Sequence, residues 1–149
     1  AQINASTEVI AHRVWADSSN FAELLAGVDV AVDALDTLPA RLELQRAAAS
    51  LGIPLVHGAI SGYTGQVMTI MPGDRGLFAL YGEVDIPQRG VETRWGNPSA
   101  TPMMIAAWEI QEVVKLLVGR GEPLRHRLLF FDAESGTVDV LHIKPEGQK

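Results

Sequence analysis

A strand, a helix and a second strand follow one another early in this chain, and this succession constrains the fold more than any other feature. Residues 28–35 are rich in β-branched side chains and apolar enough to be buried on both faces, which predicts a central parallel strand. Residues 39–51 have helical spacing, with an apolar stripe formed by Ala40, Leu44, Ala47, Ala48 and Leu51. Residues 53–60 predict the second strand, so the three segments form a βαβ unit whose crossover should be right-handed.

The rest of the chain predicts antiparallel pairing. Residues 55–60 and 66–71 are joined by a short link, so they are antiparallel neighbours or one bent strand. A helix is expected over residues 101–118, and a terminal hairpin over residues 127–132 and 137–143. Weaker signals predict a short strand at residues 9–15, one or two helical turns at 20–26 and a long loop at 82–100.

These segments together predict an α/β fold. We expect a Rossmann-like sheet in which parallel strands are followed by antiparallel strands and a terminal hairpin. Residues 1–149 form a single domain or part of one, because 149 residues leave room for one core.

Composition narrows the range of partners. The net charge of −6 argues against binding to nucleic acid or to an anionic membrane, since both need a basic surface. The apolar stretch at residues 102–118 is interrupted by charged side chains, so it predicts a buried amphipathic helix rather than a membrane span.

The chain contains no cysteine. Disulfides, thiolate nucleophiles and cysteine-ligated zinc are therefore excluded within it. The sequence opens without the pattern of a signal peptide, and we expect a cytoplasmic protein.

Asp36 is the main candidate for chemistry. It directly follows the first predicted strand and precedes a helix, at the place where open α/β sheets bind ligands. A carboxylate there suits Mg²⁺ that is shared with phosphate oxygens. The alternative is that Asp36 only caps the helix.

Two further residues near Asp36 are ambiguous. Asp33 lies within the strand and should accept a hydrogen bond from a neighbouring loop. Arg41 is one turn into the helix, where it could contact a phosphate or a carboxylate, or be a solvated surface arginine. His57 lies within an apolar strand and is interpreted as a core histidine, and the glycines form no phosphate-binding loop.

The order of several short motifs resembles the ThiF/MoeB/HesA family, the bacterial relatives of ubiquitin-activating enzymes. The stretch DVAVDALDTLPAR resembles the family pattern D-V-V-x-D-x-x-D-N-x-x-x-R. IPLVHGAISGYTGQV resembles I-P-x-V-x-G-x-x-x-G-x-x-G-Q-V, and PGD follows it as P-G does in the family. AQIN upstream and the segment from GNPSATP to DAESG downstream extend the similarity over nearly the whole chain.

The resemblance implies a specific activity. Such enzymes bind ATP and Mg²⁺ and adenylate the carboxy-terminal glycine of a β-grasp sulfur-carrier protein of the ThiS or MoaD type. Asp36 matches the magnesium-binding aspartate of the family, and Arg41 matches an arginine near the carrier tail. Family members are usually homodimers, and the apolar surface of the helix at residues 102–118 also predicts self-association.

The sequence departs from the family pattern in three ways. The glycine-rich ATP loop and the catalytic arginine and lysine lie upstream of the region that this chain matches. The first C-x-x-C pair is replaced here by Gly76, Leu77, Phe78 and Ala79, so no zinc site is expected. The asparagine after the magnesium aspartate is Thr37.

Three functional hypotheses remain open. The chain is the carboxy-terminal half of an adenylating enzyme and inactive alone, or a non-catalytic module that binds a carrier or completes a dimer. Alternatively, it belongs to an enzyme that adenylates a small-molecule or tRNA carboxylate.

Overall fold

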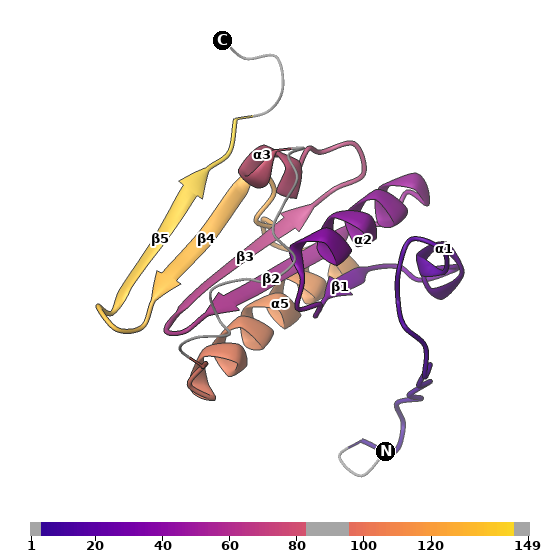
Figure 1. Cartoon of the computed structure of the whole chain (residues 1–149), viewed down its shortest axis with the longest axis horizontal. Helices are drawn as coiled ribbons and strands as arrows, with labels where there is room; N and C mark the ends of the chain where they lie inside the picture. Colours follow the sequence, from indigo (N-terminus) through magenta and orange to yellow (C-terminus); the bar gives the residue numbers. More distant parts are fainter. Residues whose placement is uncertain (1–3, 83–95, 145–149) are drawn as a thin grey trace.

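The computed structural model describes residues 4–82 and 96–144, which form a five-stranded sheet flanked by helices (Figure 1). The sheet order follows the chain, with strands β1 (Ala31–Asp33), β2 (Leu55–Ser61), β3 (Thr64–Ile70), β4 (Arg127–Asp132) and β5 (Thr137–His142). The helices are α1 (Phe21–Leu24), α2 (Leu38–Ser50), α3 (Leu77–Tyr81) and α5 (Ala100–Val118). Most of the loop predicted at residues 82–100 lies outside the described residues.

The βαβ unit is confirmed. Strands β1 and β2 are parallel neighbours, and α2 connects them. Their register places Ala31 opposite Leu55 and Asp33 opposite His57. Parallel pairing therefore brings two polar side chains together at the carboxyl end of β1.

The extent and position of β1 differ from the prediction. The strand covers only Ala31–Asp33, and among the described residues its one neighbour is β2. Ala31 and Asp33 are buried, whereas Val32 is 47% exposed. Burial on both faces is therefore not found among the described residues, where α5 packs mainly against β2 and β3.

The remaining strands are antiparallel, as predicted. β2 pairs with β3, β3 with β4, and β4 with β5. The sheet is thus parallel at one end and antiparallel over the rest, which confirms the expected fold class.

Two hydrophobic clusters cover the two faces of the sheet. On one face, α2 and α3 pack through residues such as Leu44 and Leu77 against Leu55 and Met68. On the other face, Ile105 of α5 packs against a cluster formed by Val67, Leu124, Leu129 and Phe131. This segregation follows from the alternation of side chains along each strand.

The apolar stripe of α2 was only partly predicted. Leu44 and Ala48 are buried as expected, but Leu42 and Gln45 are also buried and Leu51 is 43% exposed. Leu51 is the residue that caps the end of the helix and is not part of it.

The first segment of the chain is also different from the prediction. Residues 9–15 form no strand, and all of them are exposed. Helix α3 follows the turn at Gly73 and was not anticipated. Within residues 4–82 and 96–144, no helix is both long and apolar enough to cross a membrane.

Candidate active site

Asp36 lies in a bend between β1 and α2, at the carboxyl end of the parallel pair. Its side chain is exposed and makes no hydrogen bond with the described residues. The residue that caps α2 is Thr37, which makes no capping bond through its side chain. The geometry therefore gives no support to the alternative that Asp36 is a helix cap.

Asp33 and His57 form a buried pair beneath this bend. The side chains of both residues are fully buried, and Asp33 Oδ2 lies 2.6 Å from His57 Nδ1. Burial lowers the pKa of His57 below its ordinary value of 6.5, although the hydrogen bond to Asp33 acts in the opposite direction. His57 is therefore neutral at pH 7, and the interpretation of a satisfied core histidine holds.

The tautomer of His57 follows from its second neighbour. The amide Nε2 of Gln66 lies 3.1 Å from His57 Nε2 and 2.7 Å from the hydroxyl oxygen of Tyr81. An amide nitrogen can only donate, so His57 Nε2 accepts and the ring proton is on Nδ1, where it is donated to Asp33. One chain of hydrogen bonds thus runs from Asp33 to Tyr81.

Arg41 faces into the structure and is not a solvated surface arginine. One terminal nitrogen donates to the carbonyl oxygen of Gly58 at 2.8 Å, and the other donates to that of Leu35 at 2.5 Å. The first nitrogen also lies 3.7 Å from Asp33 Oδ2, and only 14% of the side chain is exposed. Arg41 therefore bridges α2, β2 and the bend that carries Asp36.

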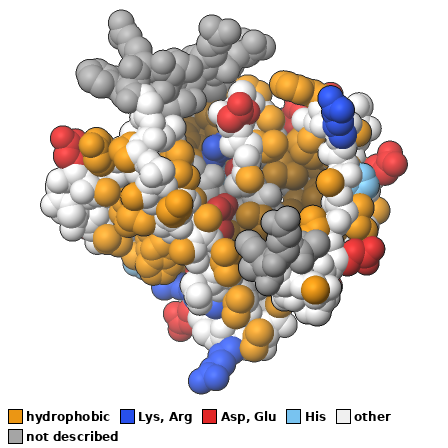
Figure 2. Space-filling view, turned by 90° about the horizontal axis from the view of Figure 1, so that it is seen from below, with side chains coloured by type: hydrophobic (Ala, Val, Ile, Leu, Met, Phe, Trp, Pro, Cys, Tyr) orange, Lys and Arg blue, Asp and Glu red, His pale blue; other side chains and the backbone are white. Residues whose placement is uncertain are grey.

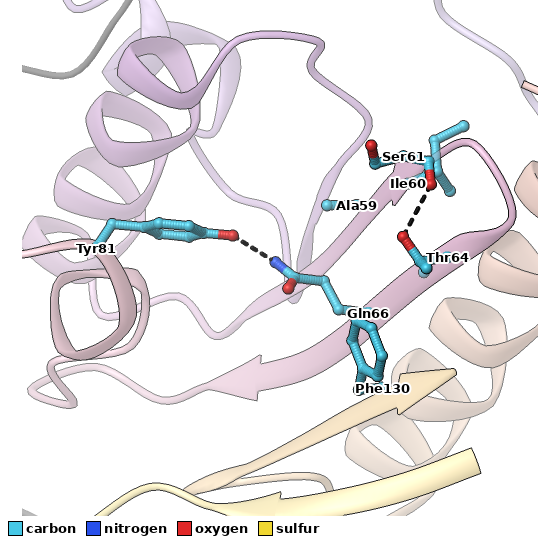
Figure 3. Close-up of a pocket in the computed structure, with 8 residues that line it drawn as sticks. Ala59, Ile60, Ser61, Thr64, Gln66, Tyr81 and Phe130 are labelled. Atoms are coloured by element: carbon cyan, nitrogen blue, oxygen red, sulfur yellow. Dashed lines mark hydrogen bonds between the residues drawn. The ribbon is translucent and has the colours of Figure 1, made fainter. Parts of the chain in front are cut away.

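Gln66 and Tyr81 line a small, partly open pocket on the face of the sheet that carries α3 (Figure 3). The rest of its wall comes from β2, β3 and β4: Ala59, Ile60, Ser61, Thr64, Gly65 and Phe130. Figure 3 shows the amide of Gln66 pointing toward the Tyr81 hydroxyl, while the Thr64 hydroxyl donates to the Ser61 carbonyl. The pocket thus combines apolar walls with several polar groups.

Glu109 of α5 lies on the other side of β2. It is 8% exposed, and its Oε1 has no hydrogen-bond partner within the described part of the chain. A β-carbon added to Gly58 would lie 2.6 Å from the Glu109 carboxyl carbon, so the carboxyl group sits directly against the backbone of β2. Burial, followed by the charge of Asp33, raises the pKa of Glu109 to about 7.

The segment at Gly76–Ala79, where the family pattern has its first cysteine pair, is held without thiolates. The Gln45 side chain accepts a hydrogen bond from the backbone of Leu77 and donates one to the carbonyl of Arg75, each at 2.8 Å. Leu77 itself is fully buried. A buried amide and an apolar side chain fix this turn.

The structure brings some of the expected residues together. Asp33 and Arg41 lie next to each other, and both contact the backbone of Leu35, which precedes Asp36. Sequence reasoning missed Gln66, Tyr81 and Glu109. Gln66 lies in the G-Q-V sequence of the family motif, which gives this residue no separate role, and nothing in the local sequence indicates that Glu109 faces the sheet.

Magnesium binding depends on the ligands that the described residues near Asp36 offer. Within the two described ranges, no group of three or more His, Cys, Asp or Glu side chains could hold a metal ion. Mg²⁺ needs no such cage, because it is often bound by one or two carboxylates together with substrate phosphates and water. The unengaged carboxylate of Asp36 fits that mode of binding.

Fold and site together define an α/β domain with an unengaged carboxylate where open sheets bind ligands. The ThiF family model matches residues 1–149, and the chain belongs to the ThiF family. The resemblance found in the sequence is therefore confirmed.

Named relatives agree with this assignment. The chain is 37% identical over 139 residues to the SAMP-activating enzyme E1 of Haloferax volcanii, covering 93% of this chain and 51% of the relative. It is 32% identical over 154 residues to the sulfur carrier protein adenylyltransferase of Thermus thermophilus, covering 95% of this chain and 55% of the relative. The chain thus spans about half the length of these two relatives.

Solved structures agree on the fold. The microcin C7 biosynthetic enzyme MccB in complex with N-formylated MccA matches with a TM-score of 0.67 and 14% identity. The match covers 88% of this chain and 42% of MccB. At this identity the likeness concerns the fold alone.

Proposed function

We propose that this chain supplies the magnesium-binding and carrier-binding part of an enzyme that adenylates the carboxy-terminal glycine of a β-grasp sulfur carrier. Two relatives are named as an adenylyltransferase for a sulfur carrier and as an activating enzyme E1. The observation that carries the proposal is the exposed and unengaged carboxylate of Asp36 at the carboxyl end of β1.

In this reaction a carrier carboxylate attacks the α-phosphorus of ATP, and pyrophosphate leaves. Asp36 would hold Mg²⁺ bound to the phosphates, and the ion would neutralise charge that develops on the leaving group. Arg41 is proposed to lie near the carrier tail, because it retains N–H groups that it does not donate to the backbone. The acyl-adenylate passes on without a thioester to this chain, which contains no thiol.

The pocket beside Gln66 supports a peptide tail as the partner. A glycine-rich tail offers mostly backbone N–H and C=O groups, and the pocket presents the Gln66 amide and the hydroxyl groups of Ser61, Thr64 and Tyr81. The apolar side chains of Ile60 and Phe130 provide contact area between these polar groups.

A homodimer in the cytoplasm is the proposed state of the whole protein. Helix α5 leaves large apolar side chains exposed, among them Met103, Ile110, Leu117 and Val118. Figure 2 shows hydrophobic side chains over much of one face of the molecule. Exposed apolar surface of this kind favours association, and light scattering at micromolar concentration should give the mass of a dimer rather than of a monomer.

The test of the activity uses a protein that includes the residues preceding this chain in its gene. Asp36→Asn should reduce ATP–pyrophosphate exchange about a hundredfold or more, because the metal ligand loses its charge. The melting temperature should change little, since no described residue bonds to this side chain. Asp29→Asn is a matched control, because Asp29 is also exposed and lies before β1 rather than after it.

The outcome separates the three hypotheses. Exchange near the wild-type rate in the Asp36→Asn variant would remove this residue from the mechanism. Carrier binding without any exchange by the wild-type protein would favour the non-catalytic module. Exchange driven by a small-molecule or tRNA carboxylate, but not by a carrier, would favour the third hypothesis.

A further inference from the structure

We infer that Asp33, His57 and Arg41 act as one positioning unit, which fixes the backbone of Leu35 and thereby holds the carboxylate of Asp36 in place. The unit is defined by the hydrogen bonds between these residues. Its effect on the rate of adenylation rests on the proposed function.

Both polar backbone groups of Leu35 are hydrogen-bonded to side chains of the positioning unit. Its N–H donates to Asp33 Oδ1 at 2.9 Å, and its carbonyl oxygen accepts from Arg41 at 2.5 Å. Leu35 also packs against the hydrophobic cluster beneath α2. The residue immediately before Asp36 therefore has little freedom to rotate.

The side chains of Asp33 and Arg41 are each fixed by a further hydrogen bond to β2. The other oxygen of Asp33 accepts the ring proton of His57, whose side chain is fully buried. The second terminal nitrogen of Arg41 donates to the carbonyl of Gly58, the residue that follows His57 in β2. Because both supports end on β2, the bend that carries Asp36 is tied to a strand with neighbours on both sides.

Asp36, in contrast, makes no hydrogen bond with the described residues and cannot fix its own position. A misplacement of about 1 Å can cost a reaction on the order of a hundredfold. Rigidity of the preceding residue is thus the way in which this fold can place a free carboxylate. Asp33 and His57 act through Leu35 and are positioning residues rather than catalytic ones.

The test combines two readouts on the protein that includes the preceding residues. The first is amide hydrogen exchange at Leu35 in Asp33→Asn and in Arg41→Lys, whose single ammonium cannot bond two carbonyls in the geometry of the guanidinium. Exchange should become at least about tenfold faster there, with β3 amides unchanged. Arg46→Lys is the matched control on the same helix, because the Arg46 guanidinium lies 4.7 Å from the centre of the Phe78 ring and donates no hydrogen bond to the described residues.

The second readout is a double-mutant cycle on pyrophosphate exchange. Asp33→Asn should lower kcat about tenfold or more with little change in the KM for the carrier. If Asp33 acts only through Asp36, the variant with both substitutions should be no slower than Asp36→Asn alone.

The outcomes are distinct. Unchanged exchange at Leu35 in both variants, or losses that multiply in the cycle, would overturn the positioning unit. If Asp36→Asn leaves the rate unchanged while Leu35 still exchanges faster in both variants, the proposed function fails and the structural unit stands.

Discussion

Two buried glutamates on α5, about one helical turn apart, have opposite surroundings. Glu112 is fully buried, and it accepts hydrogen bonds from the Thr69 hydroxyl at 2.6 Å, from the Leu124 backbone at 2.7 Å and from Lys115. Glu109 is nearly as buried, but its Oε1 has no partner within the described residues. The same residue type on the same helix therefore has two different energetic roles.

The difference lies in what the sheet offers at each position. Near Glu112, β3 offers the hydroxyl group of Thr69, and the segment before β4 offers the backbone N–H of Leu124. Near Glu109, β2 presents Gly58, which has no side chain and so offers the carboxyl group no side-chain donor. A buried carboxylate stabilises a fold only where donors surround it, because its desolvation is otherwise uncompensated.

The largest effect is expected for truncation at position 112. Glu112→Ala should lower the free energy of unfolding by about 3–4 kcal/mol, because it leaves the Thr69 hydroxyl and the Leu124 N–H buried without an acceptor. Glu109→Ala is the matched control and should cost clearly less. Denaturant unfolding measures both, and equal losses would contradict the comparison.

An intermediate, pH-dependent effect is expected at position 109. The pKa of Glu109 is raised from 4.5 to about 7, so the folded chain keeps this proton while the unfolded chain releases it. Wild-type stability should therefore fall relative to Glu109→Gln as the pH rises from about 4.5 to about 7, and then level off.

At pH 8 the Glu109→Gln variant should be more stable by on the order of 3 kcal/mol, and near pH 4 the difference should vanish. Unfolding curves across this range provide the measurement. A constant difference between the two proteins at every pH would show that the carboxyl group does not titrate with a raised pKa.

The smallest effect is expected for Lys115→Met. Lys115 pairs with Glu112 but is 26% exposed, and Glu112 keeps its other two donors. The substitution should lower the free energy of unfolding by less than about 1 kcal/mol. The difference between the two proteins should be smaller at high salt, because salt screens the ion pair in the wild-type protein. A loss as large as that of Glu112→Ala would mean that the charge pair, rather than the buried hydrogen bonds, stabilises this end of α5.

Much of the fold could be predicted from sequence because it rests on local patterns. The βαβ unit, the antiparallel pair after it and the terminal hairpin follow from strand periodicity and turn residues. That β1 has one neighbour among the described residues could not be predicted, because burial on both faces depends on which elements pack against a strand. Val32 has the side chain of a core residue and yet is exposed.

The site was predictable only in part. The place of Asp36 follows from the general location of ligands in open sheets. The contacts of Asp33 with His57, and of Arg41 with Gly58, depend on the register between β1 and β2, which spacing alone does not fix. The orientation of Glu109 likewise depends on how α5 is rotated against the sheet.

The single neighbour of β1 within the described residues has a practical consequence for this chain on its own. A strand with one neighbour presents backbone N–H and C=O groups along its other side, and such an edge can template the addition of a strand from another molecule. With Val32 exposed beside that edge, purified protein of this length should tend to aggregate on concentration by extending its sheet. Charged residues or a proline introduced near β1 should reduce this aggregation, because they block the pairing of a further strand.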